Sequence, residues 1–216
     1  ASRSVLYDEG TMNFPRNTEC EALLTFTSAS SSGRVSSVAP AGTAVTLRLH
    51  HSFVRLPDSG YTPRVYNARS GFMPLSYLDF TSPFTGSLEK RVIRRHRLQK
   101  KNPRASTSEP VEPIVYYVDR GAPEPVSTAL IEGASWWNEA FEAIGYQNAF
   151  QVRLLPEDAH PLDIRYNMIN WVHRSTRGWS YGGSVTDPRT GEIIKGNVVL
   201  GSQRIRQDVL IARSVT

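Results

Sequence analysis

The sequence predicts an α+β or α/β protein, in which an N-terminal antiparallel β domain precedes a mixed, mostly parallel twisted sheet with helices. Short β-rich apolar segments separated by turn residues fill the chain to about residue 97. A basic and then Ser/Pro/Thr-rich stretch at residues 98–110 is typical of a linker. From residue 111 to residue 216, strand and helix patterns alternate. We therefore expect two domains, residues 1–97 and residues 111–216.

The first part contains two clear strand patterns, at residues 22–27 and 44–55. In the second of these, Val45, Leu47 and Leu49 alternate with polar residues, which predicts a strand with one buried face. A serine-rich loop separates the two strands. Together these features predict a small antiparallel β domain.

The second part opens with a continuous apolar run at residues 113–119, typical of a strand buried on both faces. A helix is expected to follow, with Pro123 and Pro125 in its first turn and Gly145 at its end. Apolar residues at spacings of three and four predict one buried stripe on this helix, formed by Val126, Leu130, Gly133, Trp137, Ala140, Phe141 and Ile144. We accordingly expect Trp137 in the core.

Two further strands are predicted at residues 150–155 and 163–171. The order strand, helix, strand implies a right-handed βαβ unit with parallel strands. Residues 179–186 and 192–200 are joined by an Asp-Pro turn that ends at Gly191, which predicts a hairpin at one edge of the sheet. A last helix is expected to begin at Ser202.

The predicted edge strand has an unusual composition. Gly182 and Gly183 lie in its middle, where glycine marks either a β-bulge or the close approach of another backbone. Residues 179–185 contain no charge and no proline, the usual devices that block a free strand edge. An extended peptide could pair with such an edge. A plain β-bulge remains the alternative.

The residues that precede this strand form a polar loop. His173, Arg174 and Arg177 lie between two predicted strands, where loops carry function. The alternative is a hydrogen-bonded connector in which an arginine pairs with an acid.

Motifs of catalysis are absent from these residues. The sequence has no H-E-x-x-H, no G-x-S-x-G and no phosphate-binding glycine loop. The single cysteine, Cys20, excludes a cysteine-based zinc site and an intrachain disulfide. The five histidines are not spaced along the chain as zinc ligands are, and the adjacent His50 and His51 point to opposite faces of a strand. We therefore predict no catalytic residue and no metal ligand here.

The net charge of +5 comes from one basic stretch, residues 90–104, with eight lysines and arginines. The rest of the chain, apart from Glu89, has 17 basic and 19 acidic residues. Because few aromatic residues interleave with these bases, nucleic-acid binding is disfavoured. A solvated helix or connector is the simpler interpretation. Binding of anionic surfaces through residues 90–104 stays open as an alternative function.

Several segments resemble a bacterial family of large zinc-dependent metallopeptidases, which have a metzincin-like catalytic domain behind an N-terminal β domain of unassigned role. The longest is WVHRSTRGWSYGGSVTDPRTGEIIKG at residues 171–196. The others are residues 14–19, 94–101, 114–125, 136–145 and 163–167.

The resemblance implies that residues 111–216 form the upper subdomain of a metzincin-like catalytic domain, cut before its H-E-x-x-H motif. It implies a zinc cofactor and peptide-bond hydrolysis by zinc-activated water in the full-length protein, with this chain alone inactive. It maps the substrate-binding edge strand onto Trp179, Tyr181, Gly182, Gly183 and Ser184. The expected partners are a peptide or protein substrate and the missing C-terminal part of the protein.

The location of the protein follows from the resemblance, which implies a secreted or periplasmic protein. The first residues have neither the basic nor the apolar region of a signal peptide, so we expect a mature start or the middle of a longer chain. No apolar run approaches the roughly 20 residues that cross a bilayer, so no membrane span is expected. The alternative to a metallopeptidase fragment is a non-catalytic binding module that keeps the fold and binds peptides at the edge strand.

Overall fold

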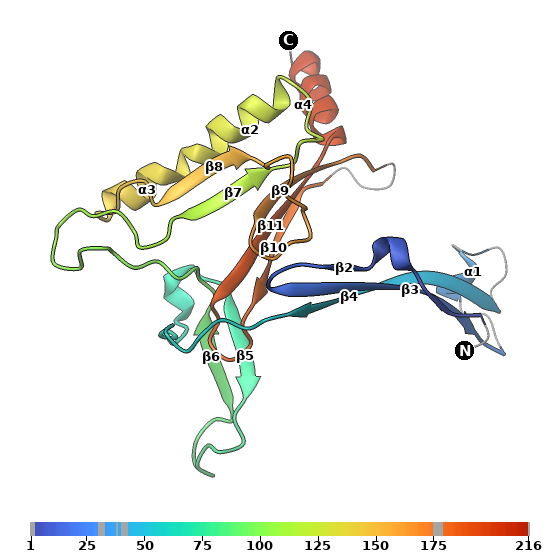
Figure 1. Ribbon diagram of the computed structural model, residues 1–216, viewed down its shortest axis with the longest axis horizontal. Coiled ribbons are helices and arrows are strands. Elements are labelled where there is room, and N and C mark those ends of the chain that lie inside the picture. Colours follow the sequence, from blue (N-terminus) through green and yellow to red (C-terminus); the bar gives the residue numbers. More distant parts are fainter. Residues whose placement is uncertain (1–2, 30–32, 38, 40–42, 175–178, 216) are drawn as a thin grey trace. The chain divides into compact units, whose positions relative to one another are not determined.

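The computed structural model describes residues 3–29, 33–37, 39, 43–174 and 179–215. This part of the chain is a mixed α+β structure with mostly sheets and few helices (Figure 1). The chain divides into two compact units, Ala1–Arg55 with Leu162–Ile164, and Leu56–Pro161 with Arg165–Thr216. This division differs from the predicted domain limits, because residues 56–97 belong to the second unit rather than the first.

The first unit is built on two long antiparallel strands, β3 (Asn17–Thr27) and β4 (Ala44–Val54). Two short strands pair with β3 as well, β1 (Val5–Leu6) and β2 (Met12–Asn13). The short helices of this unit are η1 (Asp8–Gly10) and α1 (Gly33–Ser36). The two predicted strands of the first part are therefore confirmed.

The predicted buried face of β4 forms only in part, because Val45 and Leu49 are half-buried and Leu47 is exposed. Leu47 is 47% exposed, and Phe26 on β3, which pairs with Val45, is 53% exposed. The described residues of this unit contain a single sheet, so an alternating pattern on its strands has no second layer to pack against. Instead, the buried side chains of β3 are polar, Asn17 and Glu19.

Both oxygens of the Glu19 carboxylate have hydrogen-bond partners. It accepts hydrogen bonds from Asn17 Nδ2 at 2.5 Å and from the hydroxyl of Ser52, and its Oε2 lies 2.5 Å from His50 Nε2. The amide of Asn17 also bonds the backbone of the returning segment, donating to Leu162 O and accepting from Ile164 N, each at 3.0 Å.

The second unit contains a five-stranded sheet in the order β10-β11-β9-β7-β8. The strands are β7 (Ile114–Val118), β8 (Phe150–Leu154), β9 (Asn167–Val172), β10 (Tyr181–Thr186) and β11 (Ile193–Gly201). The pairs of β7 with β8, β7 with β9 and β9 with β11 are parallel, and β10 is antiparallel to β11. The predicted mixed sheet with an antiparallel edge strand is confirmed.

The chain crosses from β7 to β8 through two helices, α2 (Val126–Ser135) and α3 (Trp137–Ala143), which lie along one face of the sheet (Figure 1). On that face Val118, Ile169 and Trp171 form the core, and Val126 and Leu130 of α2 pack against it. The crossing thus makes the predicted βαβ unit. At its end Gly145 has φ +82°, the left-handed conformation that commonly ends a helix.

The prediction of one continuous helix with Trp137 in its core is wrong. The helix is interrupted at Trp136, and Trp137 is 65% exposed. Val126, Leu130 and Phe141 of the predicted stripe are half-buried, but Ile144 is 66% exposed. The sheet therefore contacts only part of the apolar stripe and leaves the rest at the surface.

The remaining elements of the second unit lie outside this sheet. β5 (Pro74–Leu78) and β6 (Glu89–Ile93) form a separate antiparallel hairpin, preceded by η2 (Ala68–Ser70). After β11 comes α4 (Gln203–Ser214), which has no buried residue. In the described residues, we find no helix with the length and apolar character needed to span a bilayer.

The predicted linker, residues 98–110, contains no helix or strand but closes on itself. Lys101 N donates to Glu109 O at 2.9 Å, and Val111 N donates to Gln99 O at 2.8 Å. Ser108 is buried and its amide donates to Gly145 O at 3.1 Å, next to the end of α3. The segment is a closed loop whose ends are held together.

Candidate functional site

The candidate site is the edge hairpin formed by β10 and β11. Its register pairs Gly182 with Val198 and Gly183 with Asn197, with an irregularity between Val185 and Thr186. Among the described residues, β10 forms a ladder with β11 only. The other side of its backbone therefore offers N–H and C=O groups to a further strand.

The glycines of β10 leave space beside this edge. A Cβ at Gly183 would meet no heavy atom within 4 Å, and one at Gly182 would meet only Asn197 O, at 3.8 Å. The chain's own packing therefore does not require glycine at either position. Both residues are exposed, so another polypeptide could approach the backbone closely there.

Aromatic side chains flank the glycines. Trp179 is 55% exposed and Tyr181 is 48% exposed. The guanidinium carbon of Arg174 lies 5.0 Å from the centre of the Tyr181 ring, within the range of a cation–π contact. Arg174 therefore contacts an aromatic ring of the edge strand.

The loop before β10 is attached at the end of β11. His173 Nδ1 lies 2.7 Å from the hydroxyl of Ser202, and its ring makes an edge contact with Trp171 at 6.4 Å between centres. At the C-terminal end of β10, next to the turn, Ser184 Oγ and Thr186 Oγ1 are 3.0 Å apart. Arg177, the third predicted loop residue, lies outside the described residues.

The turn of the hairpin is stabilised by one buried carboxylate. Asp187 is 1% exposed, and Arg189 donates to it from Nε at 3.0 Å, from Nη2 at 2.7 Å and from its amide at 2.9 Å. These hydrogen bonds from Arg189 hold the pKa of Asp187 below its usual value. Gly191 closes the turn with φ +79° and donates its amide to Asp187 O at 2.9 Å.

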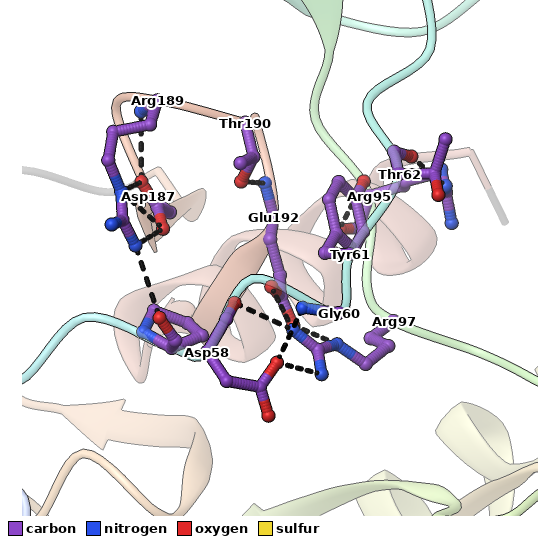
Figure 2. A network of polar contacts seen from close by, with 11 residues as sticks. Asp58, Gly60, Tyr61, Thr62, Arg95, Arg97, Asp187, Arg189, Thr190 and Glu192 are labelled. Carbon is purple, nitrogen blue, oxygen red and sulfur yellow. Dashed lines mark hydrogen bonds and ion pairs between the residues drawn. The ribbon is translucent and has the colours of Figure 1, made fainter.

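A second network connects this turn to residues 57–62 and 95–97 (Figure 2). Arg97 donates to Glu192 from Nε at 2.8 Å and from Nη2 at 2.9 Å, and to Asp58 Oδ1 from Nη1 at 2.8 Å. Arg189 Nη2 also reaches Pro57 O at 3.1 Å. Glu192 is 6% exposed, so its charge is balanced by the guanidinium of Arg97 rather than by water.

Backbone contacts complete this support. Arg95 N donates to Gly191 O at 3.1 Å, and Ile193 N donates to Arg95 O at 2.9 Å. The side chain of Arg95 lies 4.5 Å over the ring of Tyr61 and donates to Thr62 O at 2.7 Å. We call the contacts of residues 57–62 and 95–97 with the turn the hairpin brace. It fixes the turn of β10–β11 without touching the free edge of β10.

The basic stretch at residues 90–104 is largely used inside the chain. Of the two predicted forms, a solvated helix or a connector, the helix does not form, since the stretch contains part of β6 and a loop. Besides Arg95 and Arg97, Arg91 pairs with Glu89 at 2.8 Å and Lys101 with Glu109 at 3.0 Å. Lys100 Nζ donates to Ser106 O at 2.7 Å. These partners reduce the positive charge available to an anionic surface.

The described residues contain no group of three His, Cys, Asp or Glu side chains placed to hold a metal ion. His50 faces Glu19, and His173 faces Ser202. His96 lies against Tyr116, with Nε2 at 3.3 Å from the phenol oxygen. The residues that we describe therefore do not fit a zinc site.

Residues 1–101 match a family model described as a domain of unknown function (DUF5117). The match ends inside the predicted linker and includes Asp58, Arg95 and Arg97 of the hairpin brace. The edge hairpin itself lies beyond it. No curated protein and no solved structure matches the chain.

Sequence reasoning found the edge strand but missed the brace. Arg97 was assigned to a basic stretch, and nothing in the sequence connects it with Glu192, 95 residues away. The bond of Asp187 to Arg189 is local, and the Asp-Pro-Arg order of the turn could have signalled it.

Proposed function

We propose that this chain is the front part of a zinc-dependent metallopeptidase, and that β10 holds the backbone of a peptide substrate. The observation that carries the proposal is the open edge at Gly182 and Gly183. A Cβ at Gly182 would lie at an ordinary contact distance from Asn197 O, and one at Gly183 would lie in empty space. An extended peptide that pairs with β10 would gain main-chain hydrogen bonds there.

The surroundings of the edge support this role. Trp179 and Tyr181 supply exposed aromatic surface beside the glycines, where substrate side chains can pack. The hairpin brace fixes the turn in advance, so that less conformational entropy is lost when a peptide binds. We assign to Trp179, Tyr181, Gly182, Gly183 and Ser184 the binding of substrate.

The assignment to a metallopeptidase rests on the resemblance of residues 114–125, 136–145 and 171–196 to that family. In the family a zinc ion activates the water that hydrolyses the peptide bond. Since the described residues do not fit a zinc site, the ligands would come from the missing C-terminal part of the protein. We assign no catalytic residue to residues 1–216, and we propose a secreted or periplasmic location on the same resemblance.

The test uses the full-length protein, loaded with zinc, and labelled casein as the substrate. Gly183→Val adds a branched side chain where the chain itself has space, so it should lower kcat/KM by about tenfold or more while leaving Tm unchanged. Arg153→Val is the matched control, because Arg153 lies on β8, the opposite edge of the same sheet. It should retain the kcat/KM of the unmodified protein.

Two results would contradict the proposal. If Gly183→Val is folded and cleaves casein normally, β10 does not hold the substrate. If chelation and return of zinc leave casein cleavage unaffected, or no cleavage occurs at all, the protein is not a zinc peptidase. The latter outcome would favour the binding module that keeps the fold.

A further inference from the structure

A cavity of about 500 Å³ lies between the helices α2 and α3 and the face of the sheet that they partly cover. Small-molecule sites in proteins commonly have volumes of roughly 300–1,000 Å³. The helix side of the cavity includes Leu130, Gly133 and Trp137, and its sheet side includes Ile169 and Leu200. The cavity belongs wholly to the second unit, and its described lining contains no residue of β10.

Aromatic rings form much of the cavity wall. Phe141 of α3 and Phe150 of β8 are stacked, with 5.8 Å between the ring centres and 3° between the ring planes. The ring of Tyr116 on β7 lies 5.6 Å from that of Phe150, centre to centre. Trp137 adds an indole ring at the helix side. Because aromatic rings pack well on one another in offset and edge-to-face arrangements, this wall favours an aromatic ligand.

Two polar groups converge on the cavity, the imidazole of His96 and the phenol of Tyr116. Nε2 of His96 lies 3.3 Å from Tyr116 Oη. Gly196 of β11 makes room for this phenol, because a Cβ at that position would clash with Tyr116 Oη and Cζ. A phenol oxygen can take part in more than one hydrogen bond, so its contact with His96 leaves capacity for a ligand.

The wall of the cavity is uncharged. Among the described residues that line it, none is an aspartate, glutamate, lysine or arginine. Burial lowers the pKa of His96 to about 4 and raises the pKa of Tyr116, so both polar groups are neutral at pH 7. An ion that entered from water would lose its hydration without gaining a partner of opposite charge. The ligand that fits is therefore uncharged.

We propose that this cavity binds an uncharged aromatic molecule with one hydroxyl group, whose hydroxyl contacts His96 and Tyr116 and whose rings pack against Phe141 and Phe150. A hydroxyl group both donates and accepts a hydrogen bond, so it matches the neutral imidazole in either tautomer. The inference goes beyond the proposed function and does not depend on peptide cleavage, because the cavity is separate from the edge of β10.

Equilibrium dialysis at pH 7 tests the proposal on residues 1–216, with 2-naphthol, naphthalene and the anion 2-naphthoate as probes. We expect one 2-naphthol per chain, with a Kd on the order of 100 μM, and far weaker binding of 2-naphthoate. His96→Phe keeps a ring but removes the imidazole nitrogens. It should raise the Kd of 2-naphthol about fivefold and leave that of naphthalene unchanged.

A pair of leucine variants locates the bound probe. Gly133 follows Leu130 and precedes Trp137 at helical spacings, so Gly133→Leu places its side chain on the cavity face of α2. This variant should raise the Kd of 2-naphthol about tenfold or more. It should not lower Tm, because leucine is a better helix former than glycine. Glu132→Leu is the matched control, since Glu132 is exposed and lies outside the cavity lining. It should retain the Kd of the unmodified chain.

Several results would overturn the proposal. Absence of 2-naphthol binding at about 1 mM would do so, as would equally tight binding of 2-naphthoate. Binding of 2-naphthol that Gly133→Leu leaves unchanged would place the probe elsewhere. Tyr116→Phe is the second test of the polar pair and decides the outcome where His96→Phe does not fold. If the folded variants bind 2-naphthol as tightly as the unmodified chain, the cavity does not recognise a hydroxyl group.

Discussion

Arg97 donates two hydrogen bonds to the carboxylate of Glu192, 95 residues further along the chain, from Nε to Oε1 at 2.8 Å and from Nη2 to Oε2 at 2.9 Å. The side chain of Glu192 is 8% exposed and that of Arg97 is 29% exposed. Hydrogen bonds from Arg97 to Glu192 raise the pKa of the guanidinium further above its ordinary value. The pair connects the segment after β6 with the residue that precedes β11.

Arg97→Ala should lower the free energy of unfolding by about 2–4 kcal/mol, because it leaves the Glu192 carboxylate buried without its partner. Arg91→Ala is the control, since its pair with Glu89 is 49% and 41% exposed, so that water screens the two charges and the loss should be much smaller. Urea unfolding measures both variants. Equal losses would show that the Arg97 pair is worth no more than a surface ion pair.

Gly191→Ala should destabilise the protein by about 2–4 kcal/mol, because the residue has φ +79° and its Cβ would lie 2.5 Å from Ile93 O. Gly71→Ala shares the positive φ, at +71°, but its Cβ would meet nothing within 4 Å. We expect that control to lose only about 1 kcal/mol. Thermal unfolding gives the loss of stability in each variant, and the difference between the two losses measures the effect of the close contact between the turn and β6. Equal losses in the two variants would contradict that contact.

Stability should fall as the pH drops from about 6.5 to about 4, because burial lowers the pKa of His96 from 6.5 to about 4. In that window the unfolded chain binds a proton that the folded chain does not, so the stabilisation is complete above pH 6.5 and is lost toward pH 4. The loss should be roughly 2–3 kcal/mol. Urea unfolding measured across this range gives the slope of stability against pH.

His96→Phe should flatten this slope. Tyr116→Phe is the matched control, because it removes the phenol oxygen 3.3 Å from the ring nitrogen but keeps the ring buried. If burial is the cause, Tyr116→Phe keeps the slope of the unmodified protein. A slope lost in both variants would point to the hydrogen bond instead.

The loop at residues 98–110 should resist trypsin despite its basic residues. Ser108 Oγ accepts from Asn102 N at 3.0 Å and donates to Glu109 O at 2.9 Å, which closes the loop. Ser108→Ala removes both bonds and should lower stability by about 1–2 kcal/mol. Cleavage after Lys101 and Arg104 should then accelerate, as measured by mass spectrometry. Equally fast cleavage of the unmodified protein would show that the loop is an open connector.

The elements of the second unit could be predicted because their signals are local. Asp187 and Gly191 define a turn between two apolar segments, so the hairpin and its edge strand follow from a few neighbouring residues. Likewise, Gly145 marks the end of the helix that precedes β8. The parallel pairing of β7 with β8 followed from the succession of strand, helix and strand along the chain.

Burial could not be predicted in the same way, because it depends on which partners are present. The spacing of Trp137 and Ile144 shows that they form an apolar face, but not that the sheet leaves this face open. Leu47 alternates correctly on β4, yet no second layer reaches it in the part described. The Arg97 pair depends on contact between distant segments, for which one sequence contains no signal.

The short return of the chain at Leu162–Ile164 has a consequence for the gene. Those three residues belong to the unit that is otherwise Ala1–Arg55, and the side chain of Asn17 is satisfied by Leu162 O and Ile164 N. A fragment that stops at Arg55 would therefore lack both backbone partners of a buried amide. No single cut in the coding sequence separates the two units intact, because the segment 1–164 that keeps the first unit whole also contains residues 56–161 of the second.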